Sequence, residues 1–237
     1  MRRIVVAILL TASLLAACAK PTPAPLPPED IVAQAVARMK SRNSFHFIIE
    51  RTGAPAYIDT NNTLSLARAE GDFTVPDRAQ GQARIIAPGI VASIKFISIG
   101  DQYWQTNPLT GRWEEFAPGT FFNPAMLFDS EVGLQPILET DLLDLQLTGN
   151  EELEEMPGQQ LYAISGKLAG DRVAAMSWGL IGPGTMDIRL WIDPATFDLE
   201  RIQIEEPASD GGESTRWQID FLDFNKVVNI LPPATAS

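Results

Sequence analysis

The sequence has few of the side chains on which most enzymes and metal sites depend. Its 237 residues contain one cysteine, Cys18, and one histidine, His46. A single cysteine excludes an intramolecular disulfide and a cysteine-based metal site. His46 stands within an expected strand, and the sequence places no acidic residue beside it. A nucleophile elbow, a glycine-rich phosphate loop and a calcium loop are also missing. We therefore predict no catalytic residue, no metal site and a protein that is not an enzyme.

Basic residues are scarce as well. The chain has 18 Lys and Arg against 30 Asp and Glu, which gives a net charge of −12. A surface this acidic argues against nucleic acid as a partner and against electrostatic adhesion to anionic lipid headgroups. No apolar run after residue 20 approaches the length of a membrane span. Attachment to a membrane would therefore need a covalent anchor.

The N-terminal residues supply a candidate for that anchor. Arg2 and Arg3 precede an apolar run over residues 4–15, and two alanines lead directly to Cys18. This order is typical of a secretory signal, and the run is short for a membrane span. Residues 15–18, LAAC, resemble the lipobox of bacterial lipoproteins. The alternative is an ordinary signal peptide with a chance cysteine.

The lipobox interpretation divides the chain into four parts. Residues 1–17 would be a signal peptide that is removed, and Cys18 would carry a diacylglycerol and further acyl chains as its covalent anchor, with no other cofactor. Residues 18–28 would form a tether, because PTPAPLPP at 21–28 stays extended at roughly 3 Å per residue. We expect a single domain over 29–231 and a flexible tail over 232–237.

Hydrophobic periodicity predicts one long helix followed by many short strands. Apolar residues at helical spacing predict a helix over 28–41, and two further helical insertions are expected over 124–143 and 171–180. Alternating patterns bounded by turn residues predict strands. The expected strands cover residues 44–52, 90–99, 101–105, 112–116, 145–152, 160–167, 186–192, 199–205 and 216–224.

This order of elements predicts an α+β fold. We expect a strongly curved antiparallel half-barrel sheet of about nine to eleven strands, with helices closing its concave face. The insertion over 124–143 is rich in large apolar side chains and reads as a flap over one end of the sheet. Such a flap can enclose a hydrophobic cavity or cover a filled core. Periodicity alone does not separate these two possibilities.

Several stretches resemble, in their order and spacing, the LppX/LprA/LprF/LprG family of bacterial envelope lipoproteins, whose fold is similar to that of LolA and LolB. No single motif is diagnostic, but the similarity covers nearly the whole mature chain. Besides the lipobox, tether and opening helix, the matching stretches are SFHF (44–47), AEGDF (69–73), GDQYW (100–104), GRW (111–113), the helical segment 124–142, LWID (190–193), LERI (199–202) and DFLDF (220–224).

The resemblance implies a cavity that holds the acyl chains of a lipid or acylated glycolipid, which the protein would help carry across the cell envelope. It also implies a monomer that Cys18 anchors to the extracytoplasmic face of a membrane, with an envelope transporter as a candidate partner. By analogy, the apolar faces of the sheet and flap would line the cavity. These cavity residues are Phe47, Ile49, Ile94, Phe96, Leu127, Phe128, Leu134, Ile137, Leu138, Ile219 and Phe221.

Two other functions remain open at this point. A chaperone of the LolA/LolB type would use the same cavity for acylated proteins. A scaffold lipoprotein would have a filled core and would bind an envelope protein through its acidic surface. The acidic run Glu151, Glu152, Glu154 and Glu155 is the candidate for that surface, although such a run is usually a solvated face.

The lipobox interpretation makes a direct prediction. We expect Cys18→Ala to abolish incorporation of a fatty-acid label and to release the protein from the membrane fraction, because no other residue can carry the thioether. Labelling with an alkyne fatty acid, followed by fractionation, measures both effects. Equal labelling of the Cys18→Ala protein would contradict the prediction.

Overall fold

Eleven strands and four helical segments make up the computed structural model, which describes residues 26–59, 61–120, 122–208 and 212–234. The helical segments are α2 (Pro28–Lys40), the 3-10 helix η1 (Pro124–Phe128), α3 (Leu134–Thr140) and α4 (Gly170–Met176). The strands are β1 (Ser44–Gly53), β2 (Ser65–Thr74), β3 (Arg78–Ala87), β4 (Ile90–Ile99), β5 (Gln102–Thr106), β6 (Trp113–Phe116), β7 (Leu142–Glu151), β8 (Leu161–Ala169), β9 (Thr185–Ile192), β10 (Leu199–Glu206) and β11 (Thr215–Leu222).

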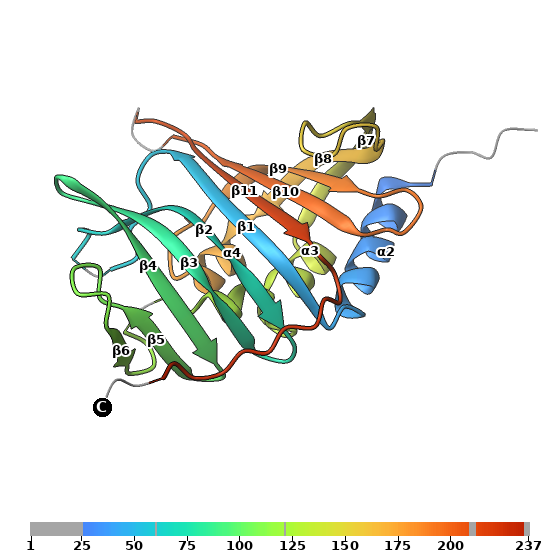
Figure 1. Cartoon of the computed structure of the whole chain (residues 1–237). Coiled ribbons are helices and arrows are strands. Elements are labelled where there is room, and N and C mark those ends of the chain that lie inside the picture. Colours follow the sequence, from blue (N-terminus) through green and yellow to red (C-terminus); the bar gives the residue numbers. More distant parts are fainter. Residues whose placement is uncertain (1–25, 60, 121, 209–211, 235–237) are drawn as a thin grey trace, which may run out of the picture.

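The described strands form one antiparallel sheet in the order β6-β5-β4-β3-β2-β1-β11-β10-β9-β8-β7. Two meanders, β1 to β6 and β7 to β11, therefore meet where β1 pairs with β11. The sheet is strongly curved, and the helices lie on one side of it (Figure 1). This arrangement confirms the predicted α+β half-barrel. The predicted signal peptide, Cys18 and most of the tether lie outside the described residues.

Helix α2 forms where the helical periodicity predicts it. Proline stands at its first position, where a missing backbone N–H costs nothing. Glu29 and Asp30 occupy the first turn, and Arg38 and Lys40 the last, so both ends complement the helix dipole. One face of α2 is buried and packs against α3, β7, β9 and β10. The helix therefore covers the half of the sheet that the second meander forms.

Two facing glycines let β2 and β3 approach closely. Gly71 pairs with Gly81, and Gly81 pairs in turn with Phe96 of β4. A Cβ on Gly71 would lie 2.1 Å from the carbonyl oxygen of Gln80. A Cβ on Gly81 would lie 2.9 Å from the ring of Phe96. Since no side chain fits at either position, the glycine pair creates the room that the Phe96 ring occupies inside the sheet.

An aromatic cluster joins the helical flap to the centre of the sheet. The ring of Phe128, at the end of η1, lies 4.9 Å from that of Phe45, 5.0 Å from Phe47 and 5.2 Å from Phe73. Its centroid lies 6.2 Å from that of Phe221 on β11. These separations are typical of favourable aromatic pairs. Phe128 therefore fixes η1 over β1, β2 and β11.

The expected strands omit β2 and β3. Their sequences, SLARAEGDFT and RAQGQARIIA, contain glycine, alanine and charged residues where β-branched side chains would mark a strand. Both strands form because each pairs with a neighbour on either side, β1 and β3 for β2, and β2 and β4 for β3. Tertiary pairing therefore overrides weak local propensity here.

Two predicted boundaries are also wrong. The helical insertion expected to reach residue 143 ends at Thr140, so Leu142 and Leu143 are the first residues of β7. The backbone N–H of Asp141 donates the last hydrogen bond of the helix to the carbonyl of Ile137, whereas the Asp141 carbonyl accepts from Ala169 on β8. Helix α4 likewise ends at Met176, four residues before its predicted end.

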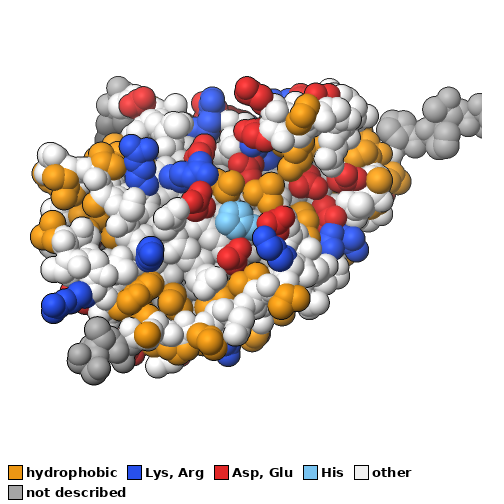
Figure 2. Space-filling model, in the orientation of Figure 1, with side chains coloured by type: hydrophobic (Ala, Val, Ile, Leu, Met, Phe, Trp, Pro, Cys, Tyr) orange, Lys and Arg blue, Asp and Glu red, His pale blue; other side chains and the backbone are white. Residues whose placement is uncertain are grey.

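The outer face of the sheet is polar and carries alternating charges, as Figure 2 shows near its centre. His46 lies there, with its Nδ1 atom 3.0 Å from Oδ1 of Asp72 on β2. The sequence placed no acid near His46, because β2 was not predicted. Arg68 pairs with Glu50 and Glu70 on the same face. These contacts place His46 in the polar outer surface, away from the apolar interior.

The aromatic cluster predicts which residue of η1 carries its stability. Phe128→Ala is expected to lower the free energy of unfolding by about 3–5 kcal/mol, because it removes a buried ring from among four others. Met126→Ala, on the exposed side of the same 3-10 helix, is the matched control and should cost less than about 1 kcal/mol. Urea denaturation measures both. Equal effects of the two substitutions would show that η1 is not held by Phe128.

Candidate functional site

The predicted cavity residues share one location. All eleven are buried in a single apolar cluster between the sheet and the helices. Three of them, Ile49, Ile94 and Phe96, line a small inner pocket of about 40 Å³. The remaining eight pack against other side chains of the cluster. Their role in lining a lipid cavity stays a prediction, because this interior is closely packed.

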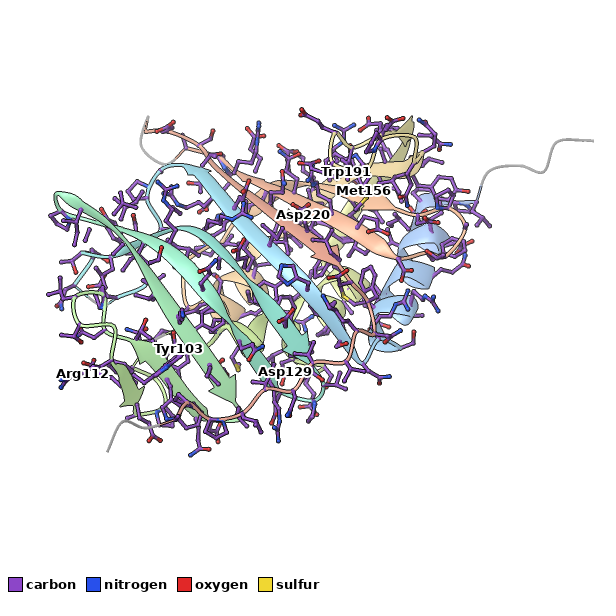
Figure 3. The ribbon with its side chains drawn as sticks, in the orientation of Figure 1. Tyr103, Arg112, Asp129, Met156, Trp191 and Asp220 are labelled. Carbon is purple, nitrogen blue, oxygen red and sulfur yellow. The ribbon has the colours of Figure 1, made fainter. Side chains whose placement is uncertain are left out.

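The inner pocket is apolar except for one polar pair. Its walls come from β1 to β5 and from the segment that leads into η1. The hydroxyl of Tyr103 donates to Oε1 of Gln105 at 3.2 Å, and burial raises the pKa of Tyr103 well above its usual range. Figure 3 shows that Tyr103 on β5 and Trp191 on β9 lie toward opposite edges of the sheet. Trp191 belongs to a separate small cluster with Leu153, Leu161 and Ala163.

A larger pocket of about 460 Å³, which we call the mouth, opens beside the inner pocket. Its walls are the β1–β2 connection, residues near 120, the segment after α4 and both sides of the β10–β11 connection. Its volume falls in the range of small-molecule sites. The apolar lining residues are Ala54, Pro55, Ala56, Tyr57, Ile58, Phe122, Trp178, Leu180 and Pro207.

Two residues belong to both the mouth and the inner pocket. Ile58 and Phe122 line each of them, so their side chains lie between the two pockets. Phe122 and Trp178 also line a third pocket of about 200 Å³. The Trp178 side chain is 51% exposed and its backbone φ is +58°, an unusual conformation for a bulky residue.

Sequence reasoning nominated none of the mouth residues. They lie in connections, where periodicity carries no information. The available signal was the pairing of a large apolar residue with a turn residue, as in Phe122-Asn123-Pro124 and Trp178-Gly179. Asn123 anchors the first of these segments, because its side chain accepts from Ser98 at 2.6 Å and caps η1 at Ala125.

The mouth is acidic. Asp59, Glu206 and Glu213 are the acidic residues among those that line it, and no Lys or Arg belongs to the lining. Burial would raise the pKa of Asp59, but backbone N–H groups of Leu64 and Thr63 donate to its carboxylate and lower the pKa overall. Glu206 accepts from the N–H of Gly182 at 2.9 Å. These carboxylates disfavour an anionic group at the mouth.

The acidic run proposed as a protein-binding surface is partly occupied by the protein's own groups. Glu151 pairs with Arg189 and accepts a hydrogen bond from Nε1 of Trp191 at 3.0 Å. Glu155 pairs with Arg201 at 3.1 Å, and the hydrogen bond from Arg201 lowers the pKa of Glu155. These contacts fold two of the four carboxylates back onto the sheet.

Residues 26–59, 61–120, 122–208 and 212–234 contain no group of three or more His, Cys, Asp or Glu arranged to hold a metal ion. Over the same residues, no helix has both the length and the hydropathy required to cross a membrane.

An ionisable cluster lies near the start of β10, away from the mouth. Asp198 is buried and pairs with Arg38 at 3.2 Å and with Arg42. Burial, together with the charges of Asp198 and Asp193, raises the pKa of Glu200 to about 7, and Arg42 opposes the rise. Glu200 therefore gains a proton at a pH where most glutamates are ionised.

Comparisons with known proteins give a consistent result. The model of the LppX_LprAFG lipoprotein family matches residues 27–230. None of the curated proteins matches the chain.

The solved structures that share the fold include two mycobacterial lipoproteins. LprF from Mycobacterium bovis has 19% identity, covers 87% of this chain and 97% of its own, and has a TM-score of 0.67. LppX from Mycobacterium tuberculosis has 17% identity, covers 86% and 97%, and has a TM-score of 0.60. A LolA superfamily protein from Nitrosomonas europaea has a TM-score of 0.30, which is too low to support an argument.

The raised pKa of Glu200 predicts how stability depends on pH. The Glu200 contribution to the free energy of unfolding is fully present below the ordinary glutamate pKa of 4.5 and is lost as pH rises through about 7. Glu200→Gln should remove this loss, so the variant gains stability relative to wild type between these pH values. Urea denaturation across this range measures the difference, with Glu205→Gln on the same strand as control. Parallel curves for wild type and Glu200→Gln would contradict the assignment.

Proposed function

This chain belongs to the LppX_LprAFG lipoprotein family, and from that premise we propose that its domain binds the acyl chains of a lipid and helps carry the lipid across the cell envelope. The observation that carries the proposal is that the two pockets are neighbours. The side chains of Ile58 and Phe122 lie between a mouth of about 460 Å³ and an inner pocket lined almost entirely by apolar side chains.

An acyl chain must displace side chains to enter this interior. The inner pocket of about 40 Å³ is much smaller than a lipid tail, so the proposal requires the η1–α3 segment to move away from the sheet. Transfer of each methylene from water yields about 0.8 kcal/mol, so a twelve-carbon tail gains about 10 kcal/mol. A gain of that order offsets the separation of η1 from the aromatic cluster, whose loss at Phe128 alone costs about 3–5 kcal/mol.

The charges of the mouth narrow the choice of lipid. Asp59, Glu206 and Glu213 line the position that a headgroup would take, and no Lys or Arg belongs to the lining. The nearby Arg51 is engaged by the charge of Glu213 and by the backbone carbonyl of Ala54. The proposed ligand is therefore a lipid with an uncharged headgroup whose hydroxyl groups can donate to these carboxylates. An anionic phospholipid would meet like charge at the mouth.

The anchor completes the proposal. A lipidated Cys18 would hold the protein on the extracytoplasmic face of a membrane, and the tether would let the domain move above it. The domain then acts as a carrier that remains attached to its membrane while the lipid occupies its interior.

Native mass spectrometry tests the lipid site. The chain from residue 18 with Cys18→Ala keeps every described helix and strand, and any acyl mass it carries must sit in the domain. We expect a one-to-one adduct with offered dioleoylglycerol and weaker occupancy with dioleoylphosphatidylglycerol. Ile58→Asp should lower the dioleoylglycerol occupancy at least tenfold, because a carboxylate between the mouth and the inner pocket resists desolvation.

Val132→Asp is the matched control, since Val132 is exposed and lines neither the mouth nor the inner pocket. It should leave occupancy unchanged, and thermal unfolding checks that both variants fold. If the chain that carries only Cys18→Ala stays free of lipid under these conditions, the proposed function is overturned.

A further inference from the structure

The β3–β4 hairpin exposes apolar side chains at its tip. Ile86, Ile90 and Val91 are 42%, 49% and 56% exposed. Pro88 and Gly89 make the turn between the strands, and the φ of Gly89 is +80°, as the second central residue of a type II turn requires. Ile86 and Val91 face each other across the pair, so their side chains lie together on the outer face.

This hairpin also differs in charge from the rest of the chain. Asp and Glu make up about one residue in eight overall, yet the 23 residues between Asp77 and Asp101 contain neither. The same stretch contains Arg78, Arg84 and Lys95. The hairpin is therefore a cationic segment of a protein whose net charge is −12.

Two of these cations are available for an external partner. Arg84 and Lys95 are exposed, and neither has an ion-pair partner among the residues that the structure describes. Arg78, by contrast, donates to the carbonyl of Ile230 at 3.0 Å. Figure 2 shows orange side chains at the upper left-hand edge of the outer face, with blue ones nearer the centre and a further blue group at the lower left edge.

The distance between the apolar tip and the nearest cation matches the depth between the apolar layer and the phosphates of a bilayer surface. Arg84 stands two residues behind Ile86 on the same face, which is about 7 Å at the rise of a strand. An apolar element at a bilayer surface buries itself about 5–10 Å deep. At that depth the guanidinium of Arg84 would lie at the level of lipid phosphates, and Lys95 would lie further out, within a Debye length or so of the surface.

The hairpin tip lies at the same end of the sheet as the mouth. In an antiparallel meander, the β1–β2, β3–β4 and β5–β6 connections leave from one end, and the β10–β11 connection joins them because β11 pairs with β1. The β1–β2 and β10–β11 connections line the mouth. Figure 1 shows the β3–β4 tip at the left and α2 at the opposite end.

We infer that the tip of the β3–β4 hairpin docks on a lipid bilayer with anionic headgroups. The apolar residues Ile86, Ile90 and Val91 enter the surface, Arg84 contacts the phosphates, and Lys95 attracts them from further out. Because the net charge of the protein is −12, the same bilayer repels the molecule as a whole and attracts its cationic hairpin, so the protein meets it hairpin first. This docking is separate from the proposed lipid cavity and does not require that the cavity be occupied. It differs from the expectation drawn from the net charge, because the charge of residues 78–100 is locally positive.

Vesicle sedimentation tests the docking surface with the chain from residue 18 carrying Cys18→Ala. We expect it to bind vesicles of equal parts phosphatidylcholine and phosphatidylglycerol, to bind pure phosphatidylcholine vesicles more weakly, and to lose binding as salt is added. Ile90→Asp/Val91→Asp should lower the partition coefficient at least tenfold. Arg84→Gln/Lys95→Gln should lower it and flatten the salt dependence.

The controls lie at the other end of the molecule. Val227→Asp replaces a side chain that is 97% exposed beyond β11, and Lys40→Gln removes a cation from the end of α2. Both should bind as wild type does. The inference would be overturned if the chain that carries only Cys18→Ala bound neither kind of vesicle. It would also be overturned if the hairpin variants bound as well as the controls. Hairpin variants whose only change, seen by analytical ultracentrifugation, is loss of a dimer would overturn it too, because a second copy would then be the partner.

Discussion

The pairing of β1 with β11 is the interaction on which the rest of the structure depends. It joins two meanders whose strands are otherwise separate, and it places Phe47 opposite Phe221, far apart in the sequence. Phe45 and Phe221 then present a common aromatic surface to Phe128, which holds the helical flap in place. Without this long-range pairing, neither meander would have a concave face large enough to bury the helices.

The same pairing builds the mouth. Gly53, at the end of β1, faces Thr215 at the start of β11, so the β1–β2 and β10–β11 connections emerge side by side. Arg51 strengthens this edge, because its guanidinium donates to the carbonyls of Leu66 and Gly53 at 2.5 and 2.7 Å. The mouth therefore has a firm wall on this side, whereas the opposite wall comes from short segments around Phe122 and Trp178.

Charge is distributed unevenly around this end of the sheet. Carboxylates surround the mouth, and the neighbouring β3–β4 hairpin has cations and no carboxylate. A bilayer with anionic headgroups attracts the hairpin and repels the molecule as a whole. An uncharged lipid is the ligand that can pass from such a bilayer into an acidic mouth without an electrostatic penalty. The charges of the mouth and of the hairpin thus support the same approach, in which the hairpin faces the bilayer.

The sequence alone determined the fold class, the opening helix, nine of the strands and the family, because these depend on periodicity, turn residues and the order of short motifs. The family model that matches residues 27–230 confirms the resemblance carried by those motifs. The sequence also identified the buried apolar residues of the sheet and flap, since burial follows alternation. The tertiary structure alone decided where β2 and β3 lie, that Asp72 reaches His46, and that Ile58, Phe122 and Trp178 surround an opening. These features depend on contacts between segments distant in the chain, and local periodicity carries no information about such contacts.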